Sequence, residues 1–176
     1  IQDDGTSKKR STLLSTIIED AVLDNEKSTY VTATTGVDFS KISSDTNGKG
    51  IYLLASTKDD ANPIYYYRGA VTNNNVKFAG FCWKIVRTTE TGGVKLIYNG
   101  TPDSNGYCTN TTGTSTQIGT SAFNSSRDAN RYVGYMYGAS SGTYEQQHAN
   151  TTSSTIKTTI DNWYQTNMTA YTEKLE

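Results

Sequence analysis

The residues that carry most enzyme chemistry are few and scattered in this chain. The only histidine, His148, follows the polar residues 145–147. A hydrolytic triad needs such a base held beside a nucleophile, and a zinc site needs three or four His, Cys or carboxylate ligands. A surface loop is the better interpretation of this polar run. The sequence therefore predicts no catalytic residue, no metal site, no cofactor and no enzyme activity.

Two short acidic segments, Asp45-Thr46-Asn47-Gly48 and Asp103-Ser104-Asn105-Gly106, resemble the beginning of a calcium-binding loop. Neither continues to the acidic residue that closes an EF-hand. Tight turns explain both segments better, because Asn and Gly tolerate positive φ angles. The chain also contains no Gly-rich phosphate loop and no dinucleotide-binding fingerprint.

The two cysteines, Cys82 and Cys108, have two interpretations. In an oxidising compartment they would form a disulfide that closes a loop of about 27 residues and stabilises the fold by roughly 3.5 kcal/mol. The alternative is a pair of buried thiols. The linkers are dominated by Ser, Thr, Asn and Gly, and only 19% of the residues are charged. This composition favours an extracellular or cell-surface protein, and with it the disulfide.

Tyrosine is the residue type that suggests binding, since the chain contains 13 of them among small polar residues. Tyrosine offers a large, rigid contact area at low entropic cost, and combines well with Ser, Gly and Asn in binding surfaces. Ordinary sheet packing is the alternative where tyrosines alternate along a strand. The candidate binding surface consists of Tyr66, Tyr132, Tyr135, Tyr137 and Tyr144.

The charge pattern argues against two classes of partner. The net charge is −1, whereas nucleic-acid-binding proteins carry a concentrated basic surplus. The longest basic run, Lys8-Lys9-Arg10, is typical of a solvated leader. No stretch approaches the ~20 apolar residues of a membrane span. We therefore expect no nucleic-acid partner and no transmembrane segment; the ligand would be a protein or a glycan, and self-association is a further possibility.

Two amphipathic helices are predicted, at about residues 12–23 and 155–167. Apolar residues recur there at three- and four-residue spacing, which is typical of one buried helix face. Ser11 and Ser154 stand where N-caps are expected. The side chains expected in the core are Leu14, Ile17, Ile18, Ile156, Ile160 and Trp163.

A β-hairpin is predicted over about residues 81–98. Residues 81–87 alternate along a strand, with Trp83 and Ile85 on a face that we expect to contact a helix. Residues 88–93 form the loop, and residues 94–98 return. Shorter strand-like runs precede the hairpin, and a polar stretch from 99 to 120 follows it. A stretch of this length in a compact domain is usually functional or tied down, which a Cys82–Cys108 bridge would accomplish.

These elements predict an α+β fold: a small antiparallel sheet with a central hairpin, flanked by two helices and joined by long polar loops. Only 34% of the residues are hydrophobic, so the core is expected to be thin. Residues 1–10 are expected to form a flexible leader, and residues 11–176 a single mixed domain.

Several of these segments together resemble a group of exported surface proteins of gut-type Gram-positive bacteria that has no assigned activity. The resemblance spans roughly residues 12–174 and rests on the tyrosine run at 65–67, the segments 74–87, 94–98 and 132–138, and the helix from 154 to 164. It implies an exported bacterial protein.

More remotely, a Trp-bearing hairpin followed by a capped helix with Ile and Trp resembles the first half of formylglycine-generating-enzyme-like and C-type-lectin-like domains. That resemblance implies a partial C-type-lectin-like fold truncated at its C-terminus, because the later segment that completes such a sheet is missing; otherwise the lectin-like interpretation fails. No oxidase chemistry carries over, since no matching catalytic motif is present.

The predicted function is a surface-exposed, non-catalytic binding or adhesion module of a bacterial extracellular protein. The first alternative is a structural subunit or stalk domain of a surface fibre, in which strands and helix contact neighbouring copies. The second is a fragment of an enzyme-like domain that lacks its catalytic half.

Overall fold

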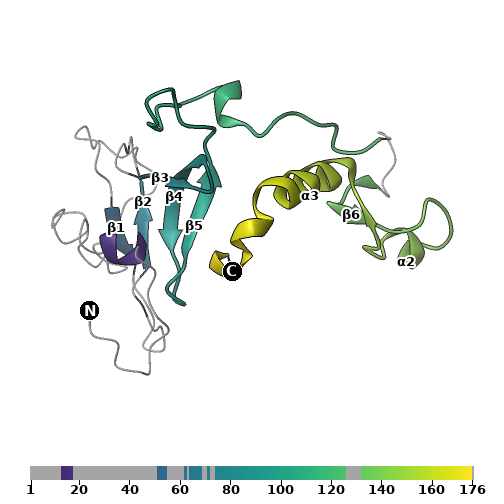
Figure 1. Ribbon diagram of the computed structural model, residues 1–176. Coiled ribbons are helices and arrows are strands. Elements are labelled where there is room, and N and C mark those ends of the chain that lie inside the picture. Colours follow the sequence, from purple (N-terminus) through teal and green to yellow (C-terminus); the bar gives the residue numbers. More distant parts are fainter. Residues whose placement is uncertain are drawn as a thin grey trace. The chain divides into compact units, whose positions relative to one another are not determined.

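The computed structural model describes residues 13–17, 51–54, 62, 64–68, 71, 74–125 and 132–175 (Figure 1). It divides into two compact units, residues 1–116 and 117–176, which are treated separately below. The prediction of an α+β fold with a small antiparallel sheet is confirmed. The predictions for a leader at 1–10, for Ile18 and the rest of the first helix beyond residue 17, and for the turn at 45–48 lie outside the described residues. The single-domain prediction and the lectin-like resemblance stay predictions.

The first unit is built on an antiparallel sheet of five strands: β1 (Ile51–Leu54), β2 (Ile64–Tyr67), β3 (Asn75–Phe78), β4 (Phe81–Thr88) and β5 (Val94–Tyr98). The long strand β4 is central. It pairs with β5 on one side, and on the other with β3 at its start and β2 near its end, while β1 pairs with β2.

The predicted hairpin is confirmed in position and direction. Strand β4 pairs antiparallel with β5, and Trp83 lies opposite Tyr98. The connecting loop is closed at its base by a hydrogen bond from Thr89 N to Gly93 O, 2.9 Å. A second hairpin joins β3 to β4 through Ala79 and Gly80, whose φ angles of 54° and 80° fit the two-residue turns that match strand twist.

A β-bulge in β4 decides which side chains enter the core. Ile85 lies opposite Leu96, but the next partner of β5, Lys95, lies opposite Arg87, so Val86 is the extra residue. An inserted residue moves each later side chain of the strand to the opposite face of the sheet. Thr88 therefore points inward, where it is fully buried, and its Oγ1 accepts a hydrogen bond from Tyr65 N at 2.8 Å.

The core of the first unit lies between this sheet face and the helical residues 13–17. Its buried members are Ile17, Tyr65 and Ile85, packed by the half-buried side chains Leu13, Tyr67, Val76, Val94 and Leu96. Leu14 is also fully buried. The expected burial of Leu14 and Ile17 is confirmed, and Ile85 packs in the same cluster as Ile17 of the helix; for Trp83, which is half-buried, the expected helix contact stays a prediction.

The second unit contains short elements and one long helix. These are strand β6 (Met136–Tyr137), helix α2 (Tyr144–Gln147), strand β7 (Thr152–Ser153), helix α3 (Thr155–Asn167) and the 3₁₀ helix η3 (Thr169–Lys174). Strands β6 and β7 pair antiparallel. Helix α3 has the bounds predicted for it, and the fully buried Ser154 is its N-cap, with its Oγ accepting a hydrogen bond from Lys157 N at 3.1 Å.

The predicted burial along α3 is only partly right. Ile156 and Trp163 are half-buried. Ile160 is 39% exposed, so its placement in the core was wrong. The apolar stripe identifies one side of the helix, but the stripe alone does not determine how much of that side a neighbouring element covers. Among the described side chains of this unit, Met168 is the buried hydrophobic residue.

Candidate functional site

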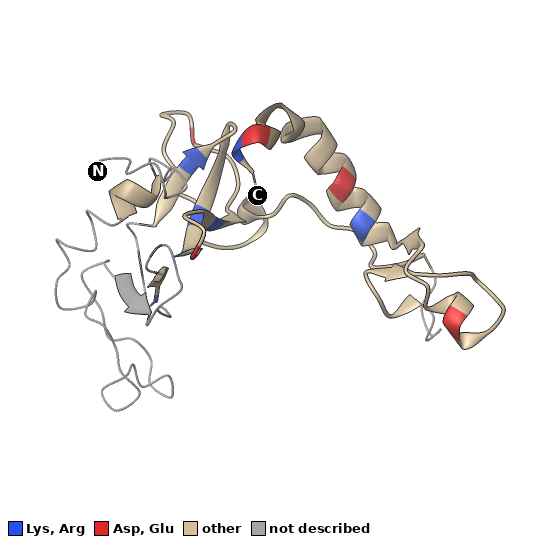
Figure 2. Cartoon of the chain, turned by 90° about the horizontal axis from the view of Figure 1, so that it is seen from below, with Lys and Arg blue, Asp and Glu red and all other residues tan. Residues whose placement is uncertain are grey.

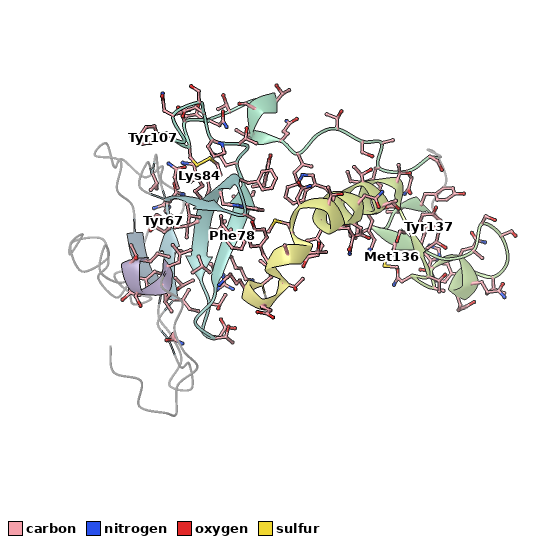
Figure 3. The ribbon with its side chains drawn as sticks, in the orientation of Figure 1. Tyr67, Phe78, Lys84, Tyr107, Met136 and Tyr137 are labelled. Carbon is pink, nitrogen blue, oxygen red and sulfur yellow. A yellow bond between two sulfur atoms is a disulfide. The ribbon has the colours of Figure 1, made fainter. Side chains whose placement is uncertain are left out.

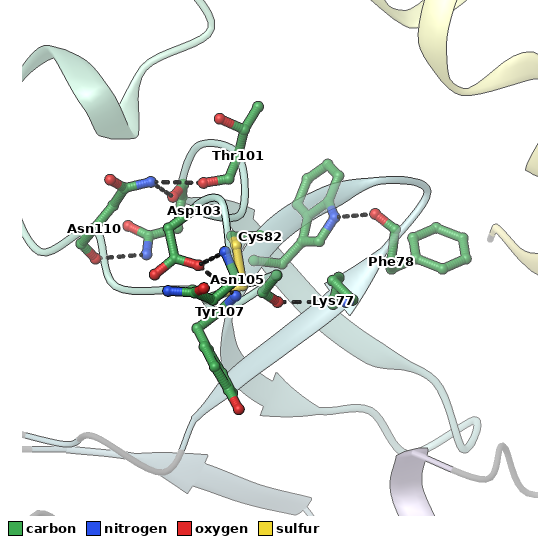
Figure 4. Close-up of a disulfide and its surroundings, with 12 residues drawn as sticks. Lys77, Phe78, Cys82, Thr101, Asp103, Asn105, Tyr107 and Asn110 are labelled. Atoms are coloured by element: carbon green, nitrogen blue, oxygen red, sulfur yellow. Dashed lines mark hydrogen bonds between the residues drawn. A yellow bond between two sulfur atoms is a disulfide. The ribbon is translucent and has the colours of Figure 1, made fainter.

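The polar stretch after β5 is held in place by the predicted disulfide. Cys82, on β4, is bonded to Cys108, with their Cα atoms 5.6 Å apart (Figure 4). Cys82 is fully buried. We call residues 99–116, which end in the 3₁₀ turn η1 (Thr114–Thr116), the disulfide loop.

Backbone and amide hydrogen bonds continue the sheet into the disulfide loop. Asn99 N donates to Cys82 O, and Cys82 N donates to Gly100 O, each at 2.8 Å. The Asn99 side chain is buried and donates to Asn110 O at 2.9 Å, while the Asn110 side chain donates to Thr101 O at 3.0 Å (Figure 4). The Asn110 side chain also donates to Asn99 O at 3.4 Å, so the two asparagines bond reciprocally and hold the two limbs of the loop together beside the bridge.

Asp103 explains why its segment resembles a calcium loop. Its Oδ1 accepts hydrogen bonds from Asn105 N and Tyr107 N, both at 2.9 Å, and Gly106 N donates to Asp103 O. The carboxylate thus closes a tight turn, as the sequence interpretation proposed for this segment. In the parts of the chain that the structure describes, no group of three or more His, Cys, Asp or Glu residues could hold a metal ion.

A glycine at the start of the disulfide loop tests how tightly its limbs are packed. Gly100 has a φ of +88°, and a Cβ there would overlap the carbonyl oxygen of Ser115. We expect Gly100→Ala to lower the free energy of unfolding by about 1–2 kcal/mol for the positive φ and by roughly 1–3 kcal/mol more for the overlap. Urea unfolding measures the loss.

Gly113→Ala is the matched control for this substitution. Gly113 has a similar φ of +80°, but a Cβ there would meet no atom within 4 Å. It should therefore show the conformational cost alone. Equal losses in the two variants would contradict the close approach of residues 100 and 115.

Four of the five predicted binding tyrosines lie together in the sequence of the second unit, around β6 and α2 (Figure 3). Tyr132 and Tyr137 contact each other edge to face, with ring centroids 4.8 Å apart, and both are half-buried. Tyr135 is 45% exposed, and Lys157 Nζ lies 5.9 Å from its ring centroid. The Tyr132–Tyr137 pair is therefore mainly packing, whereas Tyr135 is accessible.

Tyr144 is the most exposed of the predicted tyrosines, at 71%. Its ring stacks on His148, with centroids 4.1 Å apart and an interplanar angle of 26°. His148 Nδ1 lies 2.8 Å from the Tyr144 carbonyl oxygen, which fixes the imidazole against the end of the helix. The pair forms a rigid aromatic platform, called the Tyr144–His148 platform below.

Helix α2 holds the platform although it is only four residues long. Thr143 caps it: Thr143 Oγ1 accepts from Gln146 N, and Gln146 Oε1 accepts from Thr143 N, a complete capping box. Separately, hydrogen bonds to the Glu145 carboxyl hold its pKa below the usual value, the bond from the Glu145 backbone contributing most and the bond from the Thr143 side chain next. The platform thus rests on a satisfied helix end.

Close backbone packing ties α2 to the short sheet. Gly138 N and Ala139 N donate to the carbonyl oxygens of Gln147 and Gln146, both at 2.8 Å. A Cβ at Gly138 would overlap the Gln146 carbonyl oxygen, so only glycine allows this approach. Strand β6 and helix α2, and with them the platform and Tyr137, are therefore fixed relative to one another.

Lys157 connects Tyr135 to the first turns of α3. Its ammonium group donates to Asp161 one helical turn later, and this hydrogen bond raises the pKa of Lys157. The cation that faces the Tyr135 ring is thus already paired, and it positions the ring rather than offering a free charge.

Tyr66, the fifth predicted tyrosine, belongs to the first unit. It lies on β2 opposite Arg87 of β4 and is half-buried. The grouping of Tyr66 with Tyr132, Tyr135, Tyr137 and Tyr144, which belong to the second unit, stays a prediction.

His148 lies in the turn just after α2, as its C-cap, which agrees with the loop interpretation, but the four-residue helix before it was not predicted from the sequence. Two signals were present. Thr143 followed three residues later by Gln146 is a capping-box pattern, and Tyr144 and His148 have the i, i+4 spacing of neighbours on one helix face. Within the described residues, His148 has no hydroxyl, thiol or carboxylate partner that would make it a general base.

Comparison with protein-family models, with curated proteins and with solved structures found no match. No helix in the described part of the chain is long and apolar enough to cross a membrane.

Proposed function

We propose that this chain is a non-catalytic binding or adhesion module of a bacterial extracellular protein, and that its ligand contacts the tyrosines of the second unit. The observation that carries the proposal is the Tyr144–His148 platform. A tyrosine that is 71% exposed and yet fixed by stacking has little rotamer freedom left to lose when a ligand binds.

The surroundings of the platform support this proposal. Tyr135 and Val133 are 45% and 75% exposed, and the small residues Gly, Ala, Ser and Thr fill positions 138–143, which precede the helix. Aromatic side chains set among small polar residues suit ligands with both apolar faces and hydroxyl groups, such as sugars. The disulfide of the first unit is compatible with an extracellular location, where such bridges persist.

A glycan array probed with the labelled protein tests the proposal. We expect binding to at least one class of oligosaccharide, and a loss of about tenfold or more in affinity for Tyr144→Ala, because aromatic anchors dominate binding energy. Tyr107→Ala is the control: Tyr107 is 69% exposed, nearly the same as Tyr144, but lies in the disulfide loop.

Three results would contradict the proposal: no glycan bound, equal losses in the two variants, or no loss in Tyr144→Ala. Light scattering on the same samples tests the alternative of a fibre subunit. Such a subunit would assemble, so its measured mass would grow as the protein concentration rises.

A further inference from the structure

The strands of the first unit segregate charge. The five strands contain four basic residues, Lys77, Lys84, Arg87 and Lys95, and no Asp or Glu, although the whole chain carries 17 acidic residues. In Figure 2 the strands of this sheet carry blue stretches, which mark Lys and Arg. The four basic residues are called the cationic face below.

The pairing register places all four on the side of the sheet away from the core. Residues paired directly across antiparallel strands share a face. Lys77 lies opposite Cys82, Lys95 lies opposite Arg87, and Lys84 follows Cys82 by two residues. The bulge at Val86 is essential here, because unbroken alternation would turn Arg87 toward the core.

The cations form a diagonal row across three strands. Lys77 is on β3 at the start of β4, Lys84 and Arg87 follow along β4, and Lys95 is on β5 beside Arg87. Strands lie about 4.8 Å apart and same-face residues about 6.7 Å apart along a strand, so the row is roughly 16 Å long.

None of these four charges is neutralised within the described structure. Lys77 Nζ donates to the carbonyl oxygen of Gly106 at 3.4 Å (Figure 4), and Lys84 Nζ donates to Asn74 Oδ1 at 3.1 Å, both neutral acceptors. Partial burial lowers the pKa of Lys84. An anion placed over the row would offset that desolvation and supply the missing countercharge.

We propose that the cationic face binds a linear acidic polysaccharide, with its carboxylate or sulfate groups along the row from Lys77 to Lys95. A row of cations roughly 16 Å long across three strands fits an extended polyanion better than a small anion. Three of the four cations are lysines, which act as mobile point charges rather than as planar phosphate forks. This surface belongs to the first unit, and the proposal goes beyond the function proposed for the tyrosines of the second unit.

The neutral residues of the same face favour a polysaccharide over other polyanions. Ile97, which lies opposite Lys84, is 59% exposed, and an apolar side chain there can pack against the C–H face of a sugar ring. Tyr66 lies on the same face opposite Arg87 and is half-buried, and the chain's net charge of −1 lacks the general basic surplus of nucleic-acid-binding proteins.

Fluorescence anisotropy with labelled heparin and with labelled polygalacturonate tests this proposal. The variant is Lys77→Gln/Arg87→Gln/Lys95→Gln. The matched control is Lys8→Gln/Lys9→Gln/Arg10→Gln. It also removes two lysines and one arginine, but from another part of the sequence. We expect both polymers to bind, with an affinity that falls as salt is raised and drops about tenfold or more in the cationic-face variant alone.

Duplex DNA and vesicles of phosphatidylglycerol with phosphatidylcholine are titrated in parallel. Binding to neither polysaccharide, an equal loss in the two triple variants, or tighter binding to DNA or vesicles would each overturn the proposal. The urea midpoint checks folding of the variant. If it falls, Lys77→Gln/Lys95→Gln replaces the triple variant, since both of these side chains are exposed, and must still weaken binding more than Lys8→Gln/Lys9→Gln does.

Discussion

Removing the disulfide by Cys82→Ala/Cys108→Ala should lower the free energy of unfolding by roughly 3.5 kcal/mol, the entropic effect of opening a loop of this length in the unfolded chain. Alanine is chosen because Cys82 is fully buried, where a serine hydroxyl would add a desolvation cost of its own. Urea unfolding monitored by tryptophan fluorescence gives the difference, since Trp83 is the next residue along β4.

Reductant provides the control for this prediction. It should destabilise the wild-type protein by a similar amount and leave the double variant unchanged. Amide exchange in the disulfide loop should quicken in both cases, because the reciprocal bonds of Asn99 and Asn110 would then hold the loop alone. Two free thiols in the denatured, unreduced wild-type protein would contradict the bridge.

Truncating Ile85 should have an effect of comparable size. Ile85 is 4% exposed at the centre of the first unit's core, and Ile85→Ala should cost about 2–5 kcal/mol through lost burial and the cavity left behind. The control is Ile97→Ala on the neighbouring strand, where the same side chain is 59% exposed and lies on the cationic face. That change should alter stability by less than about 0.5 kcal/mol.

The two isoleucine variants together test the orientation of the sheet. In both thermal and urea unfolding, the Ile85→Ala variant should be much less stable than the Ile97→Ala variant. Similar losses, or a larger loss at Ile97, would mean that the opposite face of the sheet is covered and that the assignment of the core is wrong.

The sequence predicts the local elements well where periodicity is strong. Residues 81–98 alternate clearly, and residues 155–167 repeat at helical spacing behind a serine cap, so the hairpin and α3 occur where they were expected. The bridge between Cys82 and Cys108 followed from composition and from a long polar stretch that needed an anchor.

Features that depend on a single inserted residue or on tertiary coverage were not predictable. Nothing in Val86-Arg87-Thr88 marks Val86 as a bulge, so alternation alone misplaces Arg87 and hides the cationic face. The exposure of Ile160 is of the same kind, since a helical stripe does not say what covers it.

The bridge between β4 and the disulfide loop also limits how far this chain can be stretched. Cys82 and Cys108 are 26 residues apart, so the loop between them cannot extend when the chain is pulled from its ends. At the reach of a fully extended backbone, that segment would otherwise add roughly 90 Å of length. Under tension the oxidised protein is therefore a shorter tether than its sequence suggests, and it lengthens by this increment only when the bond is reduced.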